Sequence, residues 1–227
     1  MASTTHSPDP AGRPYGGIGP AARQAQRQQS FLDAGLAVFG TSGYRTATVR
    51  QLCREAGLTD RYFYESFAST EDLLLAVYQR AFNALEDAVM GAILQAGSGD
   101  PDGLMAGLRA GLEATYAMAA DPRVARVCWL EVLGVSPRVD QVYQGNFERY
   151  GKLITAIALQ LAPHWKPSAT EARVLGVGLA GAVSLNVTQW LLGGYGDSQS
   201  DMVNATLPLF TAVMRQLAIP PESSSPR

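Results

Sequence analysis

Four neighbouring residues, Asp60, Arg61, Tyr62 and Tyr64, carry groups that suit the recognition of DNA bases. An arginine can donate two hydrogen bonds to guanine, and tyrosine rings can pack on thymine methyl groups or reach phosphates. On one helix these side chains could enter a major groove together. Whether they do depends on the elements around them.

The surrounding residues predict two short helices joined by a tight turn. In the first helix the apolar positions recur at i, i+3, i+4 and i+7 and form one buried face: Val49, Leu52, Cys53 and Ala56. Gly57 suits the left-handed residue that ends a helix, and Thr59 can cap the second helix. Phe63 and Phe67, one turn apart, would anchor that second helix to the core. This layout is typical of a helix-turn-helix.

Charge and helix ends favour phosphate binding in the same region. Arg45, Arg50 and Arg54 precede the second helix, and helices that begin near Thr48 and Thr70 would point backbone amides at phosphate oxygens. Residues 1–65 hold 7 Lys and Arg against 5 Asp and Glu, whereas residues 66–227 hold 11 against 15. The whole chain, with a formal charge of −2, is not a uniformly basic nucleic-acid coat, so positive charge can act only locally.

Residues 28–78 resemble the tetracycline-repressor (TetR) family of bacterial regulators. Spacing and residue type agree with that family's N-terminal pattern at Thr48, Leu52, Cys53, Ala56, Gly57, Leu58, Thr59, Phe63, Tyr64, Phe67 and Leu73. The stretch from Phe31 to Tyr44 is similar to the family's first helix and turn. The sequence departs at three positions. Arg61 stands where the family often has Gly, Ser66 where it often has His, and Thr70 where Lys commonly grips phosphate.

The resemblance implies a DNA-binding domain and supplies candidate contacts. Carried over by position, with Arg45 added for its charge, the predicted DNA-binding residues are Arg45, Thr48, Arg50, Thr59, Asp60, Arg61, Tyr62, Tyr64 and Thr70. For each of them the alternative is an ordinary surface or core residue. The missing His and Lys weaken the phosphate contacts, while Arg61 can restore charge or read a base.

The rest of the chain is also predicted to be helical, so the expected fold class is all-α. Capping residues and prolines predict helices over 22–40, 48–56, 59–66, 70–96, 101–120, 122–133, 137–162, 169–193 and 199–217. We expect residues 21–68 to form the DNA-binding domain and residues 69–219 a helical domain for ligand binding and dimerisation. Segments 1–20 and 220–227 are rich in Pro and Ser and are expected to be disordered tails.

The predicted helix over 169–193 is apolar around most of its circumference. Its small side chains form one ridge, Ala172, Gly176, Ala180, Ser184 and Thr188, and its large ones another, Leu175, Leu179, Val183, Val187 and Leu191. Small residues permit close approach, so we expect this helix and the last one to form a four-helix homodimer interface, as the resemblance also implies. The alternative is a core helix within one chain. Its length would span a membrane, but its polar residues and glycines favour a soluble protein.

Aromatic and polar residues of the middle helices could line a ligand cavity. They are Tyr116, Met118, Trp129, Tyr150, Asn186, Gln189 and Trp190. Pockets are mostly apolar with a few placed polar groups, although core packing explains these residues equally well. The resemblance implies a small-molecule effector, and the scarcity of charge favours an apolar or aromatic one. Such a ligand would favour a conformation whose two DNA-reading helices are wrongly spaced.

No sequence feature predicts an enzyme, a cofactor or a metal site. His6 and His164 lack the partners of a catalytic triad or a zinc site, and phosphate-binding loops are missing. Cys53 and Cys128 are expected to be small core residues. Without a secretory signal, the sequence predicts a cytoplasmic transcriptional regulator, most simply a repressor that its ligand releases from double-stranded DNA. The alternatives are an activator or co-regulator of the same fold, or a helical-bundle enzyme or carrier without DNA function.

Overall fold

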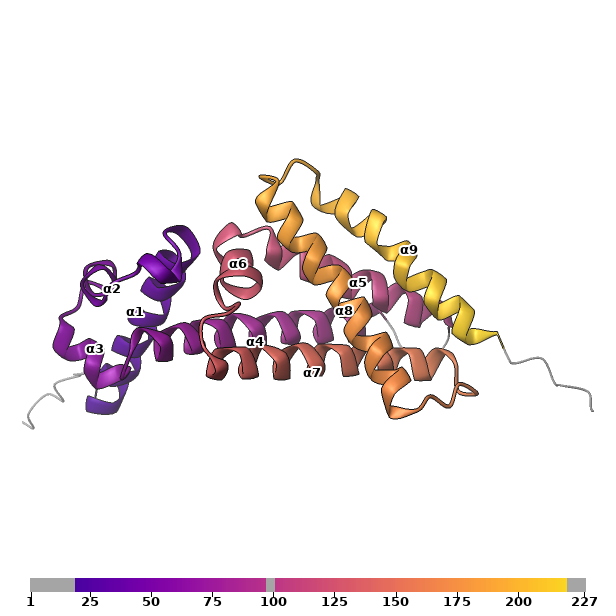
Figure 1. The fold of residues 1–227 in the computed structure, drawn as a ribbon, viewed down its shortest axis with the longest axis horizontal. Coiled ribbons are helices and arrows are strands. Elements are labelled where there is room, and N and C mark those ends of the chain that lie inside the picture. Colours follow the sequence, from indigo (N-terminus) through magenta and orange to yellow (C-terminus); the bar gives the residue numbers. More distant parts are fainter. Residues whose placement is uncertain (1–18, 97–100, 220–227) are drawn as a thin grey trace, which may run out of the picture.

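The computed structural model describes residues 19–96 and 101–219, and within these ranges the chain is helical, without β-strands. α1 (Pro20–Thr41), α2 (Val49–Ala56) and α3 (Asp60–Ser66) form a head at one end of the molecule, and α4 (Thr70–Ala96) runs from the head into the body (Figure 1). The body contains α5 (Pro101–Ala119), α6 (Pro122–Arg126), α7 (Pro137–Leu161), α8 (Ala169–Leu192) and α9 (Gln199–Ala218). Most of the predicted tails, residues 1–18 and 220–227, lies outside the described residues.

The helices begin close to where the sequence predicts because side-chain oxygens accept hydrogen bonds from first-turn amides. Thr48 accepts from the amide of Gln51 at 3.2 Å, and Ser168 accepts from the amide of Glu171 at 3.2 Å. The Glu171 carboxylate in turn accepts from the Ser168 amide at 2.7 Å, which completes a capping box. The helix predicted over 122–133 differs. After Arg126 it widens into a π-helical turn, η2 (Val127–Glu131).

A continuous apolar core joins the head to the body along α4. Leu73, Leu74 and Val77 are fully buried at the head end, and Leu85 and Val89 are buried further along the helix. The interior side chains of α4 therefore pack first against head helices and then against body helices. This shared helix fixes where the head sits on the body.

α7 and α8 approach each other closely at two glycines. A Cβ added to Gly176 would collide with the carbonyl oxygen of Gly151 and would lie 2.6 Å from Thr155 Oγ1. Further along α8, Ala180 and Ser184 also face the interior of the chain. The buried part of the small ridge, Gly176 and Ala180, thus packs within one chain, whereas Ala172, Ser184 and Thr188 remain half-exposed.

α8 is long and apolar enough to cross a membrane by length and composition alone, with a mean hydropathy of 1.4 in its most apolar stretch. A core helix of a soluble protein meets the same criteria. One third of that stretch is buried in the chain, and α8 packs against both α7 and α9. The hydropathy of α8 is therefore weak evidence for a membrane span.

Candidate DNA-binding face and ligand cavity

The turn between α2 and α3 depends on a glycine. α2 ends at Gly57, whose φ of +65° lies in the left-handed region that disfavours side chains with a Cβ. The amide of Leu58 donates to the carbonyl of Cys53 at 3.0 Å, and the amide of Gly57 donates to that of Arg54 at 3.3 Å. Thr59 then precedes α3 in extended conformation. Its hydroxyl, predicted to cap α3, makes no capping hydrogen bond and is exposed.

Two phenylalanines attach α3 to the head, as the sequence predicts. Phe63 is fully buried and Phe67 almost so, and both rings meet Phe31 of α1 edge to face, with centroids 5.4 and 6.4 Å apart. Because Phe63 and Phe67 lie one turn apart, they face inward together. The opposite side of α3 consequently faces outward.

The outward side of α3 carries the residues predicted to read DNA. Arg61 and Asp60 are exposed, Tyr64 is 61% exposed, and Tyr62 is half-buried. Arg61 Nε donates to Glu65 Oε1 at 2.9 Å. Both side chains of this pair are exposed to solvent, so a phosphate or a base can replace the carboxylate at little cost.

Arg27 of α1 is a neighbour of this face that the sequence did not indicate. Its guanidinium stacks on the ring of Tyr62, 4.6 Å from the ring centroid, and lies 3.9 Å from the Glu65 carboxylate. Arg27 therefore restrains Tyr62 and adds positive charge beside α3. Only the fold brings the two helices together, whereas the Arg61–Glu65 spacing of four residues is visible in the sequence.

The remaining predicted DNA contacts lie at helix starts and at the junction with the body. Thr48 and Arg50 are exposed at the beginning of α2, and Thr70 is half-buried at the first position of α4. Arg45 is exposed in the 3-10 turn η1 (Tyr44–Thr46), where its guanidinium donates to the carbonyl of Gly134 in the body at 3.4 Å. All nine predicted residues have accessible side chains, but Arg45 is engaged at the junction.

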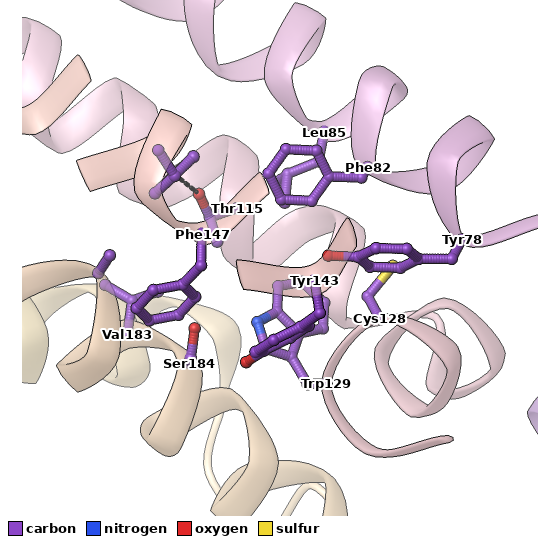
Figure 2. A pocket seen from close by; sticks show the side chains of 12 residues that line it. Tyr78, Phe82, Leu85, Thr115, Cys128, Trp129, Tyr143, Phe147, Val183 and Ser184 are labelled. Carbon is purple, nitrogen blue, oxygen red and sulfur yellow. Dashed lines mark hydrogen bonds between the residues drawn. The ribbon is translucent and has the colours of Figure 1, made fainter. Parts of the chain in front are cut away.

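The body contains a cavity that is partly open to solvent and has a free volume of about 30 Å³ (Figure 2). Side chains from α4, α5, α7, α8 and η2 form its walls, and six of them are aromatic. The lining residues are Tyr78, Phe82, Leu85, Thr115, Cys128, Trp129, Tyr143, Phe147, Tyr150, Ala180, Val183 and Ser184. This volume is far below the roughly 300 to 1,000 Å³ of small-molecule sites, so a ligand would have to displace wall side chains such as Trp129.

Two of the seven predicted ligand residues, Trp129 and Tyr150, line this cavity. The other five lie outside it: Tyr116, Met118, Asn186, Gln189 and Trp190. The sequence did not indicate the α4 and α7 rings of the wall, because their apolar spacing is that of any core-facing helix.

The polar atoms of three of these five residues are used within the chain. The Tyr116 hydroxyl lies 2.7 Å from Thr206 Oγ1 of α9, and the Asn186 amide donates to the same oxygen at 3.4 Å. The Trp190 indole N–H donates to the carbonyl of Asp197 at 3.0 Å. These contacts join α5, α8 and α9, so they account for the residues as packing groups.

The π-helical turn η2 connects the cavity to the head. It places Cys128 and Trp129 in the cavity wall and Glu131 against the head. The Glu131 carboxylate accepts from the Tyr44 amide at 2.7 Å and from Arg126 Nε at 2.8 Å. π-turns often mark functional sites in helices. Here the turn puts a cavity residue and a head-binding residue two positions apart.

Both cysteines are buried free thiols. Burial raises the pKa of Cys53 to about 11 and that of Cys128 to about 12, so both thiols stay protonated near neutral pH. Within residues 19–96 and 101–219, no group of three His, Cys, Asp or Glu side chains is arranged to hold a metal ion.

Known proteins share both the head sequence and the overall architecture. The model of the tetR family of bacterial regulatory proteins matches residues 31–77. The fatty acid degradation regulator FadR from Bacillus halodurans has a TM-score of 0.70 and 19% identity, over 86% of this chain and 96% of that one. FadR from Bacillus subtilis, solved in complex with stearoyl-CoA, has a TM-score of 0.69 and 18% identity, over 85% and 99%.

A TetR-like transcriptional regulator from Rhodococcus sp. RHA1 has the same architecture, with a TM-score of 0.65 and 18% identity over 87% of this chain and 98% of that one. No curated protein matches the sequence. The family match spans the helix-turn-helix and the start of α4, and the structural likeness extends through the body. These solved structures are of transcriptional regulators. Residues 31–77 thus match the family model of tetR bacterial regulatory proteins, and the described chain has the fold of solved transcriptional regulators.

Proposed function

We propose that this regulator is a cytoplasmic repressor that binds a near-palindromic operator as a homodimer and leaves it when a small ligand enters the body cavity. The observation that carries the proposal is the orientation of α3. Phe63 and Phe67 hold the helix on the head, while Arg61 and Tyr64 face outward. A helix presented in this way can enter a major groove without rearrangement. A dimer bound across a promoter would block transcription.

Exposed apolar side chains on α8 and α9 favour the dimer. Val174, Leu185 and Leu192 of α8 are 58–62% exposed, and Leu209 of α9 is 47% exposed. The three α8 residues are separated by three and two helical turns, so they lie on one face. Exposed apolar side chains that share one helix face are a common feature of interaction sites. Two copies related by a two-fold axis would cover the patch with four helices.

The contact between η2 and the head supports release by a ligand. A ligand that displaces Trp129 in the wall would also shift Glu131, which holds the Tyr44 amide. The head would then turn relative to the body, and the two α3 helices of a dimer would no longer match successive major grooves. FadR from Bacillus subtilis, which shares this fold, was solved with stearoyl-CoA, and this supports a ligand-responsive body.

A gel shift with the DNA upstream of the regulator's own gene tests DNA binding by α3. Arg61→Ala and Tyr64→Ala should each weaken specific binding by about 1–3 kcal/mol, because each removes a base or phosphate contact. Arg215→Ala, at the exposed end of α9, is the matched control and should leave binding unchanged. Unchanged binding by both α3 variants would show that another surface reads the DNA.

Light scattering on the purified protein tests the dimer. Leu185→Glu should convert the dimer to a monomer, because it places a charge in the proposed interface. Leu94→Glu on α4 is the control, since Leu94 is 67% exposed and lies outside that interface. A wild-type protein that is monomeric at micromolar concentration would contradict the proposal.

A further inference from the structure

The walls of the body cavity carry no charged side chain; they are aliphatic, aromatic, hydroxyl-bearing or thiol groups. Arg149 touches the wall from outside the lining, with its guanidinium 5.2 Å from the centroid of Phe82. Its Nε lies 3.0 Å from the Glu86 carboxylate, so its charge is already compensated. An anion inside the cavity would lose its hydration without gaining a cationic partner, which disfavours its binding relative to a neutral molecule.

Three rings of the wall follow one another, with moderately inclined planes. The planes of Tyr78 and Tyr143 are inclined by 30° with centroids 6.3 Å apart, and those of Tyr143 and Phe147 by 28° at 5.8 Å. The indole of Trp129 belongs to the same wall (Figure 2). Flat aromatic molecules gain more from offset or edge contacts with such rings than flexible alkyl chains do. The wall therefore favours a planar ligand.

Three polar groups of the wall have no hydrogen-bond partner among the described residues: the Trp129 indole N–H and the hydroxyls of Tyr143 and Ser184. Figure 2 shows them toward the same end of the cavity. The Thr115 and Tyr150 hydroxyls, by contrast, bind each other at 2.8 Å. Burial raises the pKa of Tyr143, so its hydroxyl stays protonated and can donate. An indole N–H can only donate, so the unused groups suit an acceptor oxygen.

We propose that the cavity binds an uncharged, planar aromatic molecule that carries an acceptor oxygen, such as a ketone or ester carbonyl. Trp129, Tyr143 and Ser184 select the oxygen, and the neighbouring rings of Tyr78, Tyr143 and Phe147 select the aromatic framework. The inference rests on the proposed function, because it names the class of effector that would act there. It also excludes carboxylates and acyl-CoA molecules as ligands of this cavity.

Binding of three probes to the full-length protein tests this class. Methyl 2-naphthoate and 2-naphthoate share their rings and differ in charge at neutral pH, and stearoyl-CoA represents the acyl-CoA alternative. Calorimetry should show the ester binding about tenfold or more tightly than either anion, since only the ester enters without an unpaired charge. Equal or tighter binding of an anion would overturn the proposal, and so would a lack of binding by the ester.

Conservative variants test the role of the polar groups. Trp129→Phe and Ser184→Ala keep the wall largely filled but remove a hydrogen-bonding group, and each should weaken ester binding by about 3- to 10-fold. Binding of 2-methylnaphthalene, which has no oxygen, should stay unchanged in both variants. Trp165→Phe lies outside the cavity and is the matched control. Equal losses for ester and hydrocarbon would show a packing effect only and would overturn the assignment of these groups.

A gel shift of the protein without any of these ligands distinguishes a failure of this inference from a failure of the proposed function. If the protein shifts its DNA while the ester fails to bind, the ligand class is wrong and the DNA-binding function stands. If the ester binds as expected while no DNA is shifted, the ligand class stands and the regulatory proposal fails.

Discussion

The head and the body hold their helices together in different ways. In the head, the rings of Phe31, Phe63 and Phe67 meet edge to face and fill the space between α1 and α3. In the body, α7 and α8 pack backbone against backbone at Gly151 and Gly176, and a cavity lies beside that contact. The head is thus a filled unit with an outward polar face. The body keeps internal space and uncovered apolar surface.

This difference agrees with the separate tasks that we propose for the two regions. Reading a base sequence needs a helix held in one position, and a filled aromatic core provides this rigidity. Responding to a ligand needs space inside the fold and a connection to the reading helix. α4 and the Glu131–Tyr44 contact supply that connection.

Replacing Phe63 should have the largest effect and should be confined to the head. Phe63→Ala removes a fully buried ring and should destabilise the head by about 3–5 kcal/mol. All three tryptophans, Trp129, Trp165 and Trp190, lie in the body, so tryptophan fluorescence reports on that region alone. Hydrogen exchange of head amides should accelerate strongly in urea well before the fluorescence changes.

Leu85→Ala on the body part of α4 is the reciprocal control, because Leu85 is buried and lines the cavity. It should shift the fluorescence transition in the same experiment. If both variants moved both signals equally, head and body would unfold as one cooperative unit, and the contrast between them would hold for packing but not for stability.

Removing the Glu131 carboxylate should have the next largest effect and should weaken the contact between the head and the body. Glu131→Ala leaves the Tyr44 amide and the Arg126 guanidinium without their acceptor and should cost about 1.5–3 kcal/mol. Exchange of the Tyr44 amide should rise more than that of amides within α3. Glu113→Ala, which removes the acidic partner of Arg109 on α5, is the control and should leave Tyr44 exchange unchanged.

The head could be predicted from sequence almost residue by residue because its signals are local. Thr48 caps α2, Gly57 supplies the left-handed turn, and Phe63 and Phe67 follow one helical turn apart. Each feature depends on neighbours within a few positions. Arg27 was missed because its contact with Tyr62 arises from the packing of two helices and leaves no trace in spacing.

The cavity could not be predicted in this way because four helices and one π-turn supply its walls. An aromatic residue that faces the cavity and one that faces the core have the same spacing along a helix, so Tyr78 and Tyr116 look alike in sequence. The ridge of α8 shows the same limit. Its small residues correctly indicated a close helix contact, but spacing alone did not show that the partner is α7 of the same chain.

Adding a methyl group to the small ridge of α8 tests how tightly α7 and α8 pack in the body. Gly176→Ala places a Cβ against the Gly151 carbonyl and should destabilise the body by about 1–3 kcal/mol, measured by the tryptophan fluorescence transition in urea. Gly145→Ala on α7 is the control, because a Cβ there meets no atom within 4 Å. It should be neutral or stabilising, by up to about 1 kcal/mol. Equal stability of the two variants would mean that α7 and α8 separate easily.

The smallest expected effect is a pH-dependent one at the contact between the start of α4 and the start of α7. The Arg138 guanidinium donates to Asp72 Oδ1 at 2.6 Å and holds the pKa of that carboxyl below its usual value. The pair stabilises the fold only while Asp72 is ionised, so its contribution is present at neutral pH. This contribution begins to fall when the pH drops below about 4, the ordinary pKa of an aspartate in the unfolded chain. It is gone once the pH has passed below the lower pKa that Asp72 has in the folded state. Arg138 is 60% exposed, so Arg138→Ala should cost less than about 1 kcal/mol at pH 7. The free energies of unfolding of wild type and variant, measured in urea, should converge as the solution is acidified. If a difference persisted once Asp72 is protonated, Arg138 would act through packing and not through charge.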